Sequence, residues 1–375
     1  MPEIWLRYGT TDVVLDIKFE NLANHISSTF QVPQEQEQDI KTALTSGVAL
    51  TDKMLFLGLS GSKAAAKIIM MLAEEAGTRG LSFTIDVPSK IASTLRSNLS
   101  GIETISINRI GYQSLNERMA KFQNTIIVSS VAYDPLFGFA GAPTTLLRNL
   151  FADRMAEAFK ARKNNRPTPG VEGDPLKVAT SAVESIPATS VELVANGDNV
   201  AGIHIGSIKE AFDKATAQLH LISAVEAEPA KCAIISASDE ASTHSTLASA
   251  LNSLWNSIHI VKEGGTAILL AETREGIGGG ALQMFIEGQL KQEQLQLSPY
   301  INGLEHLLFI EELRPKYEMG LVSTLPHYYA KTKLGFTTYS GTKDILQRLQ
   351  EKHGKNFKTL VLSNADITLL KSKEG

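Results

Sequence analysis

The first residues of the chain alternate between apolar and polar side chains on either side of a short turn. The segment "EIWLRYG" alternates, "GTTD" supplies turn-forming residues, and "DVVLDIKF" alternates again. Alternation of this kind is typical of a strand with one buried face, and two such runs around a turn predict a β-hairpin. We therefore expect the chain to begin with an antiparallel pair of strands.

Between residues 32 and 133, short apolar runs alternate with amphipathic stretches. The apolar runs predict strands and read "KMLFLGL", "LSFTIDV", "IETISINRI" and "NTIIVSSVAY". The amphipathic stretches predict helices and read "VPQEQEQDIKTALTSGVAL", "AAAKIIMMLAEEAG", "IASTLRSNL" and "SLNERMAKF". Continuously apolar strands that are each followed by a helix indicate a parallel sheet covered by helices.

A less regular region separates this alternation from a second one. Residues 161–177 contain three prolines and two glycines, which predicts an exposed loop, and a long helix is expected after Gly206. Alternation then resumes with the strand "AKCAIISAS", the helix "TLASALNSLWNSIHIV", the strand "TAILLAE" and the helix "ALQMFIEGQLKQEQL", followed by "LLFIEEL", "DILQRLQEKHG" and "KTLVLSN". We therefore predict an α/β protein of two domains, 1–206 and 228–375, joined by a bridging helix at 207–227, with a ligand cleft between the domains.

The composition excludes several classes of function. The chain has 375 residues, and 36 Lys+Arg against 40 Asp+Glu give a net charge of −4, so no overall positive field favours nucleic acid. Cys232 is the only cysteine, which excludes an internal disulfide and suits a reducing cytoplasm. No signal-peptide pattern follows Met1, and no run of about 18 apolar residues predicts a membrane span. We expect a cytoplasmic protein without nucleic-acid or membrane partners, and the oligomeric state stays open.

A polar turn between a predicted strand and a predicted helix is the first possible ligand site. In "LFLGLSGSKAAAKI" the turn consists of Ser60, Gly61, Ser62 and Lys63. Backbone N–H groups at the start of a helix favour phosphate or carboxylate. The glycine spacing of a Walker A loop is missing, and Ser62 stands where a nucleophile elbow has its second glycine. The alternative is that both serines only cap the helix.

A glycine loop after another predicted strand is the second possible site. In "AETREGIGGGAL", Glu275, Gly276 and Gly278 precede Ala281, which formally matches a dinucleotide fingerprint. The fingerprint should follow its strand at once, but "ETRE" intervenes, and no strand ends in an acid about twenty residues on. A loop that contacts a ligand with its backbone is the interpretation we prefer.

The remaining polar residues form no strong motif. Only His25 precedes residue 204 among the eight histidines, and no two histidines have the i, i+4 spacing of a helical zinc pair. A catalytic triad of Ser60, His244 and Asp239 has no support beyond residue type. The run Lys160, Arg162, Lys163 and Arg166 is typical of solvated loop charge, with anion capture as the alternative.

Four stretches together resemble the nickel-dependent lactate racemase family. They are the opening "LRYGTTDVVLDIKFENL", the glycine segment "GFAGAPTTLLRN" (138–149), "GDNVAGIHIG" (197–206), in which His204 stands at a family histidine, and "VKEGGTAILLAETREGIGGGAL" (261–282). Their order and spacing fit nearly the whole chain. The resemblance implies the two-domain lactate racemase-like fold.

The resemblance also implies a chemistry. In that family a nickel pincer nucleotide takes a hydride from the α-carbon of a 2-hydroxy acid and returns it, while two histidines alternate as base. A lysine in the glycine segment carries the cofactor, and a further histidine helps to hold nickel. Imidazoles suit both tasks because they titrate near neutrality and bind nickel when neutral.

The functional residues of the family do not carry over to this chain. The cofactor lysine falls on Thr144, and the two bases fall near Asp134 and on Ser89. The nickel histidine falls near Lys160, and no histidine lies between residues 26 and 203, where the family needs three. The substrate-binding turn "DHTR" falls on the turn 60–63 and keeps at most one cation. The helix with Tyr-Gln and Lys falls on Ala248, Ser249 and Asn252.

We therefore expect the racemase fold without its nickel machinery, hence no cofactor and no metal, and the catalytic residues stay unknown. The first hypothesis is a divergent member that binds a small anionic ligand, a 2-hydroxy acid or a phosphate-like group, in the cleft. The second is a 2-hydroxy-acid racemase or epimerase, an isomerase with a rearranged site. The third is a non-catalytic scaffold or regulatory subunit. The expected ligand-binding residues are Ser60, Gly61, Ser62, Lys63, Gly138, Gly141, Thr144, His204, Glu275, Gly276 and Gly278.

Overall fold

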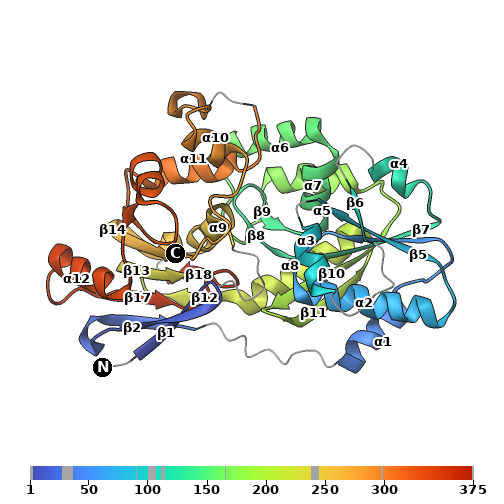
Figure 1. The fold of residues 1–375 in the computed structure, drawn as a ribbon, viewed down its shortest axis with the longest axis horizontal. Helices are drawn as coiled ribbons and strands as arrows, with labels where there is room; N and C mark the ends of the chain where they lie inside the picture. Colours follow the sequence, from blue (N-terminus) through green and yellow to red (C-terminus); the bar gives the residue numbers. More distant parts are fainter. Residues whose placement is uncertain are drawn as a thin grey trace. The chain divides into compact units, whose positions relative to one another are not determined.

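The structure is a computed structural model, and it describes residues 3–27, 37–89, 91–99, 107–110, 115–164, 166–237, 245–296 and 299–373. The chain divides into two compact units. Unit 1 comprises Met1–Thr29 and Ser223–Gly375, and unit 2 comprises Phe30–Ile222. Each unit contains its own six-stranded sheet covered by helices, which confirms the α/β class (Figure 1).

Unit 2 is built on a sheet with the strand order β11-β10-β7-β4-β5-β6, in which only β11 runs antiparallel. All five residues of β4 are buried, as a strand covered on both faces requires. Its elements are α1 (Glu37–Gly47), β4 (Met54–Gly58), α2 (Lys63–Thr78), β5 (Phe83–Pro88), α3 (Ala92–Asn98), β6 (Ile107–Ile110), α4 (Leu115–Met119), β7 (Asn124–Ser130), β8 (Ala132–Asp134), β9 (Gly138–Ala140), α5 (Ala142–Leu150), α6 (Ala152–Asn164), α7 (Asp174–Val183), β10 (Thr189–Asn196), β11 (Asn199–Gly206) and α8 (Ile208–Ser223).

The two faces of this sheet are covered by different helices. Phe56, Val128 and Leu193 lie in one apolar cluster with side chains of α1, α2 and α3. Leu57 and Ile127, one position along on their strands, lie in a second cluster with side chains of α5 and α7. Successive strand residues point to opposite faces, so unit 2 has three layers with the sheet in the middle.

Unit 1 is built on an all-parallel sheet with the strand order β16-β15-β14-β13-β17-β3. The N-terminal hairpin and α12 pack on one face, and α9 packs against β13 and β14. Its elements are β1 (Glu3–Tyr8), β2 (Thr11–Asp16), β3 (Leu22–Ile26), β12 (Ala224–Ala227), β13 (Ala230–Ser236), α9 (Leu247–Ser257), β14 (Val261–Leu270), α10 (Ala281–Ile286), α11 (Leu304–Leu313), β15 (Glu318–Val322), the π-helix Tyr328–Lys333, β16 (Thr337–Thr338), α12 (Thr342–His353), β17 (Thr359–Leu362) and β18 (Leu369–Ser372), with short 3-10 turns at Phe19–Asn21, Ile258–Ile260 and Gln292–Gln294.

The division of the chain differs from the predicted domains at its N-terminus. The predicted hairpin is present as β1 and β2, but it packs on the C-terminal sheet, and β3 pairs in parallel with β17. The Thr342 hydroxyl donates to the Val14 carbonyl at 2.8 Å, so the hairpin and α12 lie side by side (Figure 1). The helix predicted as a bridge, α8, belongs to unit 2 up to Ile222. The cleft between domains stays a prediction.

The structure differs from the predicted elements at three places. The loop predicted at 161–177 is shorter, because α6 continues to Asn164 and α7 starts at Asp174. The helix predicted from Ala281 ends at Ile286, because Gly288 adopts φ +78° and the chain turns back there. The segment "LLFIEEL" is part of α11, and the strand that follows it, β15, has no counterpart in the predicted series.

The hairpin supplies a test of its role in unit 1. Leu6 is fully buried in the core shared with the sheet, whereas its neighbour Trp5 points to the opposite side and is 61% exposed. Leu6→Ala is expected to lower the free energy of unfolding of unit 1 by about 2 to 5 kcal/mol, because it removes buried volume that cannot refill. Chemical denaturation followed by the fluorescence of the buried Trp255 measures this, since both tryptophans lie in unit 1.

Trp5→Ala is the matched control and leaves Trp255 as the reporter. It is expected to change the free energy of unfolding by about 0.5 kcal/mol or less, because the side chain is exposed. Equal effects of the two substitutions would contradict the packing of the hairpin on the sheet.

Candidate functional site

The strand order of unit 2 contains a point where the chain reverses direction across the sheet. From β4 the chain moves outward through β5 to β6, and then it crosses back to β7 on the other side of β4. The carboxyl ends of the two strands at such a point leave a crevice in which α/β proteins bind ligands. The turn 60–63 follows β4, and residues 131–141 follow β7, so the topology places both predicted segments at this edge.

The turn 60–63 has the geometry of a capped helix start. Ser62 is the N-cap of α2, and its hydroxyl accepts the N–H of Ala65 at 3.2 Å. The Ser60 hydroxyl donates to that of Ser62 at 3.2 Å. The capping role weighed in the sequence is therefore present for Ser62. Within the part of the chain that the structure describes, the N–H groups of Lys63 and Ala64 have no acceptor, as is usual for a first helical turn.

The cation of this turn is already paired. The Lys63 ammonium lies 2.5 Å from a carboxylate oxygen of Asp198, which sits in the turn between β10 and β11. Both side chains are about half exposed, at 53% and 43%, so solvent screens the pair and it contributes little to stability. An anion at the start of α2 must compete with Asp198 for Lys63.

The glycine segment 138–144 is shaped by close backbone contacts. Gly138 has φ +88°, and a Cβ there would lie 2.4 Å from the Val171 carbonyl oxygen. Thr144 is buried, and its hydroxyl accepts the Gly141 N–H at 3.0 Å, so it caps the start of α5. The hydroxyl at the position of the family's cofactor lysine is therefore used within the protein.

A buried carboxyl group lies beneath this helix start. Glu192 on β10 is fully buried, and its Oε1 accepts the Ala142 N–H at 2.8 Å. Burial raises the pKa of Glu192 to about 8, against the lowering effect of hydrogen bonds from Ala142, Ser129 and Ser190. Its Oε2 has no hydrogen-bond partner among the described residues. The α5 N-terminus is thus satisfied by the protein's own carboxyl group.

Glu192 has polar residues as its neighbours on the two adjacent strands. In the registers of the sheet, Glu192 stands opposite Ser129 of β7 and opposite His204 of β11, so the three side chains share one face. The His204 Nε2 is 2.6 Å from the Gln218 Oε1, and Gln218 donates to the Ala201 carbonyl at 3.1 Å. The structure therefore brings the predicted residues near Gly141 together with His204, around a glutamate that the sequence analysis missed. An acid at an inward position of the apolar run "SVELVA" was the available signal.

Asp134, near which the resemblance places one family base, is held by an ion pair with Arg148. Its carboxylate is 2.9 Å from the guanidinium of Arg148 and accepts the N–H groups of Leu136 at 2.8 Å and Phe137 at 3.0 Å. Both charged side chains are largely buried. This arrangement fixes the turn between β8 and β9.

The third predicted segment lies in unit 1 and packs on the start of α9. The carbonyls of Gly276 and Ile277 accept the N–H groups of Leu247 at 3.0 Å and Ala248 at 3.1 Å. Glu275 accepts the hydroxyl of Ser245 at 2.7 Å. Gly278 has φ +86°, which favours glycine there. Whether this loop faces the segments of unit 2 stays a prediction.

The other candidates of the sequence do not form a site in the described structure. Asp239 and His244 lie outside the described residues. Lys160, Arg162 and Lys163 belong to α6, where Arg162 is buried and Lys163 lies 4.9 Å from the Phe159 ring. Arg166 follows the end of the helix, so only the last residue of the run lies in a loop. Across the ranges that the structure covers, no three His, Cys, Asp or Glu side chains gather as metal ligands. No helix within those ranges combines the length and apolar character of a membrane span.

The residues at the family's cofactor positions do not fit a nickel nucleotide. Thr144 has no amine to carry it and uses its hydroxyl to cap α5. Asp134 is engaged by Arg148, and Lys160 on α6 has no imidazole ring.

The whole fold is similar to that of solved structures. The lactate racemase apoprotein from Thermoanaerobacterium thermosaccharolyticum matches with a TM-score of 0.78 and 12% identity, over 99% of this chain and 100% of that one. A protein from Thermotoga maritima matches with a TM-score of 0.67 and 12% identity, over 90% and 98% of the two chains. No protein-family model and no curated protein matches the sequence. The chain therefore has a lactate racemase-like fold.

Glu192 gives a pH dependence whose sign is fixed. The unfolded carboxyl titrates near its ordinary value of 4.5 and the folded one at about 8, so the folded state holds the proton more tightly. The protonated Glu192 therefore contributes to the free energy of unfolding. This contribution is fully present below about pH 4.5 and is lost as the pH rises to about 8, by at most about 1.4 kcal/mol per pH unit. Urea unfolding of the wild type and Glu192→Gln from acid to alkaline pH measures this. Glu192→Gln is expected to flatten this decline, and parallel pH curves would contradict it.

Proposed function

We propose that this protein binds a small anionic ligand, a 2-hydroxy acid or a phosphate-like group, at the carboxyl edge of the unit 2 sheet. The observation that carries the proposal is the start of α2 at the β4–β7 reversal, where the N–H groups of Lys63 and Ala64 have no acceptor among the described residues and the first helical residue is a lysine. A helix of sixteen residues adds the positive end of its dipole.

Asp198 sets the affinity of this site. Its carboxylate lies 2.5 Å from the Lys63 ammonium, so an anion that binds Lys63 replaces one carboxylate by another or by phosphate. After this exchange the Lys63 ammonium is still paired with an anion. The ligand also accepts hydrogen bonds from the N–H groups at the start of α2. We expect weak and reversible binding, which suits sensing or transient capture of a metabolite.

The same site is proposed not to carry out nickel-dependent hydride transfer. The support is chemical. The cofactor position is the capping hydroxyl of Thr144, and one base position is Asp134, which Arg148 holds in an ion pair. The carboxyl group at the start of α5 is that of Glu192, which accepts the Ala142 N–H. These residues support a binding protein better than a racemase.

The ion pair supplies opposite predictions for its two members. Lys63→Ala is expected to weaken binding of lactate, phosphate or sulfate about tenfold, because it removes a charge-assisted contact. Asp198→Asn is expected to strengthen binding about threefold or more, because it removes the competing anion while retaining the size of the side chain. Thermal shifts at increasing anion concentration measure both affinities, since a ligand of the native state raises the melting temperature.

Lys67→Ala is the matched control, because Lys67 lies on the same helix one turn further and is also half exposed. It is expected to leave anion binding unchanged. Lys63→Ala itself is expected to alter the free energy of unfolding by about 0.5 kcal/mol or less. Equal affinities of the wild type and Lys63→Ala would reject this site and favour a scaffold role.

A separate prediction concerns the nickel nucleotide cofactor. After expression in a host with an active nickel-nucleotide pathway, the intact mass of the protein is expected to equal that of the bare chain, because Thr144 offers no amine for a covalent link. Mass spectrometry together with metal analysis of the purified protein measures this. A covalent adduct near Thr144, or racemisation of a 2-hydroxy acid by the protein, would instead favour a rearranged isomerase.

A further inference from the structure

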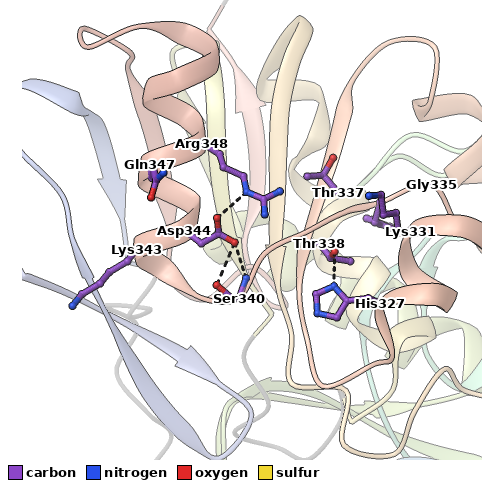
Figure 2. Close-up of a pocket in the computed structure, with 11 residues that line it drawn as sticks. His327, Lys331, Gly335, Thr337, Thr338, Ser340, Lys343, Asp344, Gln347 and Arg348 are labelled. Carbon is purple, nitrogen blue, oxygen red and sulfur yellow. Dashed lines mark hydrogen bonds and ion pairs between the residues drawn. The ribbon is translucent and has the colours of Figure 1, made fainter.

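Unit 1 contains a polar groove that is independent of the site proposed above. The groove has a volume of about 1010 Å³ and runs beside the edge strand β16. Figure 2 shows α12 on one side, the segment with His327 and Lys331 on the other, and Thr338 and Ser340 between them. All of its lining residues belong to unit 1, so its shape does not depend on unit 2.

The charge of the groove is opposite to that of the chain. Lys331, Lys343 and Arg348 line it together with a single carboxylate, Asp344, whereas the whole protein has a net charge of −4. Asp344 is engaged within the wall: Arg348 donates to it from Nε at 2.7 Å, and Ser340 donates to it from its N–H at 2.9 Å. The carboxylate therefore repels an incoming anion less than its formal charge suggests.

The cations of the groove have capacity for a ligand. Lys331 and Lys343 are exposed, and neither forms an ion pair within the described ranges of the chain. Arg348 lies 5.2 Å from the Tyr339 ring and uses Nε for Asp344, which leaves the two terminal nitrogens of its planar fork. In Figure 2, Arg348 and Lys331 extend into the groove from opposite walls, and Lys343 extends outward from α12.

The wall that carries Lys331 has an unusual backbone. Tyr328–Lys333 forms a π-helix, a rare conformation that is frequent at functional sites because it redirects side chains. It starts directly after His327, whose Nδ1 is 2.7 Å from the Thr338 hydroxyl. This contact holds the imidazole beside the Thr338 hydroxyl, which also lines the groove. Ammonium, guanidinium, imidazole and hydroxyl groups thus surround one space.

We propose that this groove binds the phosphate group of a small phosphorylated molecule. Lysine and the arginine fork are the side chains that proteins use for phosphate, and hydroxyls complete its hydrogen bonds. A ligand with one carboxylate group would need fewer hydrogen-bond donors than the groove offers. The volume also exceeds that of free phosphate and falls in the range of pockets for metabolite-sized ligands, so the remainder of the molecule has room beside β16.

The test measures pyrophosphate binding to the full-length chain by isothermal titration calorimetry at constant ionic strength. All variants carry Lys63→Ala, so that the site at the start of α2 does not contribute. Saturable binding is expected, and Lys331→Ala is expected to weaken it about tenfold through loss of a charge-assisted contact. Lys343→Ala is expected to weaken it less, because that side chain extends outward. Lys358→Ala, an exposed lysine of unit 1 outside the groove lining, is expected to leave binding unchanged.

Two further arms separate this proposal from other occupants. Inorganic phosphate is expected to compete with pyrophosphate, whereas lactate is not. A polyglutamate peptide that binds more tightly than pyrophosphate, and is weakened by Lys331→Ala, would overturn the proposal in favour of an acidic protein partner. Absence of saturable pyrophosphate binding, or equal binding by the parent and Lys331→Ala, would overturn it as well. Circular dichroism of each variant verifies that the fold is retained, and Lys343→Ala repeats the test if Lys331→Ala is misfolded.

Discussion

Burial of both sheet faces is the constraint on which the other features of this protein depend. A parallel strand covered by helices on either side has no contact with water, so each polar side chain on it needs a partner inside the protein. Asp86 on β5 is fully buried and is paired with Arg118 at 2.7 Å and with Asn108 at 3.1 Å. Glu192 has no cation beside it among the described residues and instead keeps its proton near neutral pH, with the α5 N–H as its hydrogen-bond donor.

This constraint also moves the chemistry to the edges of the sheets. Strand interiors are closed to solvent, and therefore charged groups with freedom to bind a ligand occur where strands end or where a sheet stops. Lys63 stands at the carboxyl edge of the unit 2 sheet, and Lys331 lies beside the edge strand β16 of unit 1. The first is restrained by Asp198, and the second has no ion-pair partner in the described structure. The two positions differ in how much of their charge is available to a ligand.

The sequence predicted the elements that depend on local patterns. The hairpin, α2 with its Ser62 cap and the buried strand β4 all follow from periodicity and capping over a few residues. The placement of the hairpin could not be predicted this way, because its partners, Cys232 and Ile234 among them, lie more than two hundred residues away. The turn at Gly197, with φ +58°, closes β10 on β11, and its "NGD" signal was present but not used.

The candidate site was less predictable than the fold for a physical reason. The residue type indicated that Ser62 could either cap the helix or bind a ligand. The structure shows that its hydroxyl accepts the Ala65 N–H and so caps the helix. Asp198 and Glu192 come from segments far along the chain, so their contacts with Lys63 and Ala142 carry no local signal. The groove in unit 1 combines residues of three neighbouring elements, whose charges look like ordinary surface when they are read in order.

The similarity of fold at 12% identity has a physical cause. The sheets require apolar residues of suitable size at alternating positions, and many sequences meet that requirement. A binding or catalytic site requires particular side chains at fixed points, so a likeness of fold does not carry a site with it. Thr144 is a residue that serves the fold: its hydroxyl accepts the Gly141 N–H at the start of α5, the helix whose Ala142 N–H is bound by Glu192. Contacts of this kind stabilise the fold whatever ligand the protein binds, and therefore one fold can be shared by chains whose sites differ.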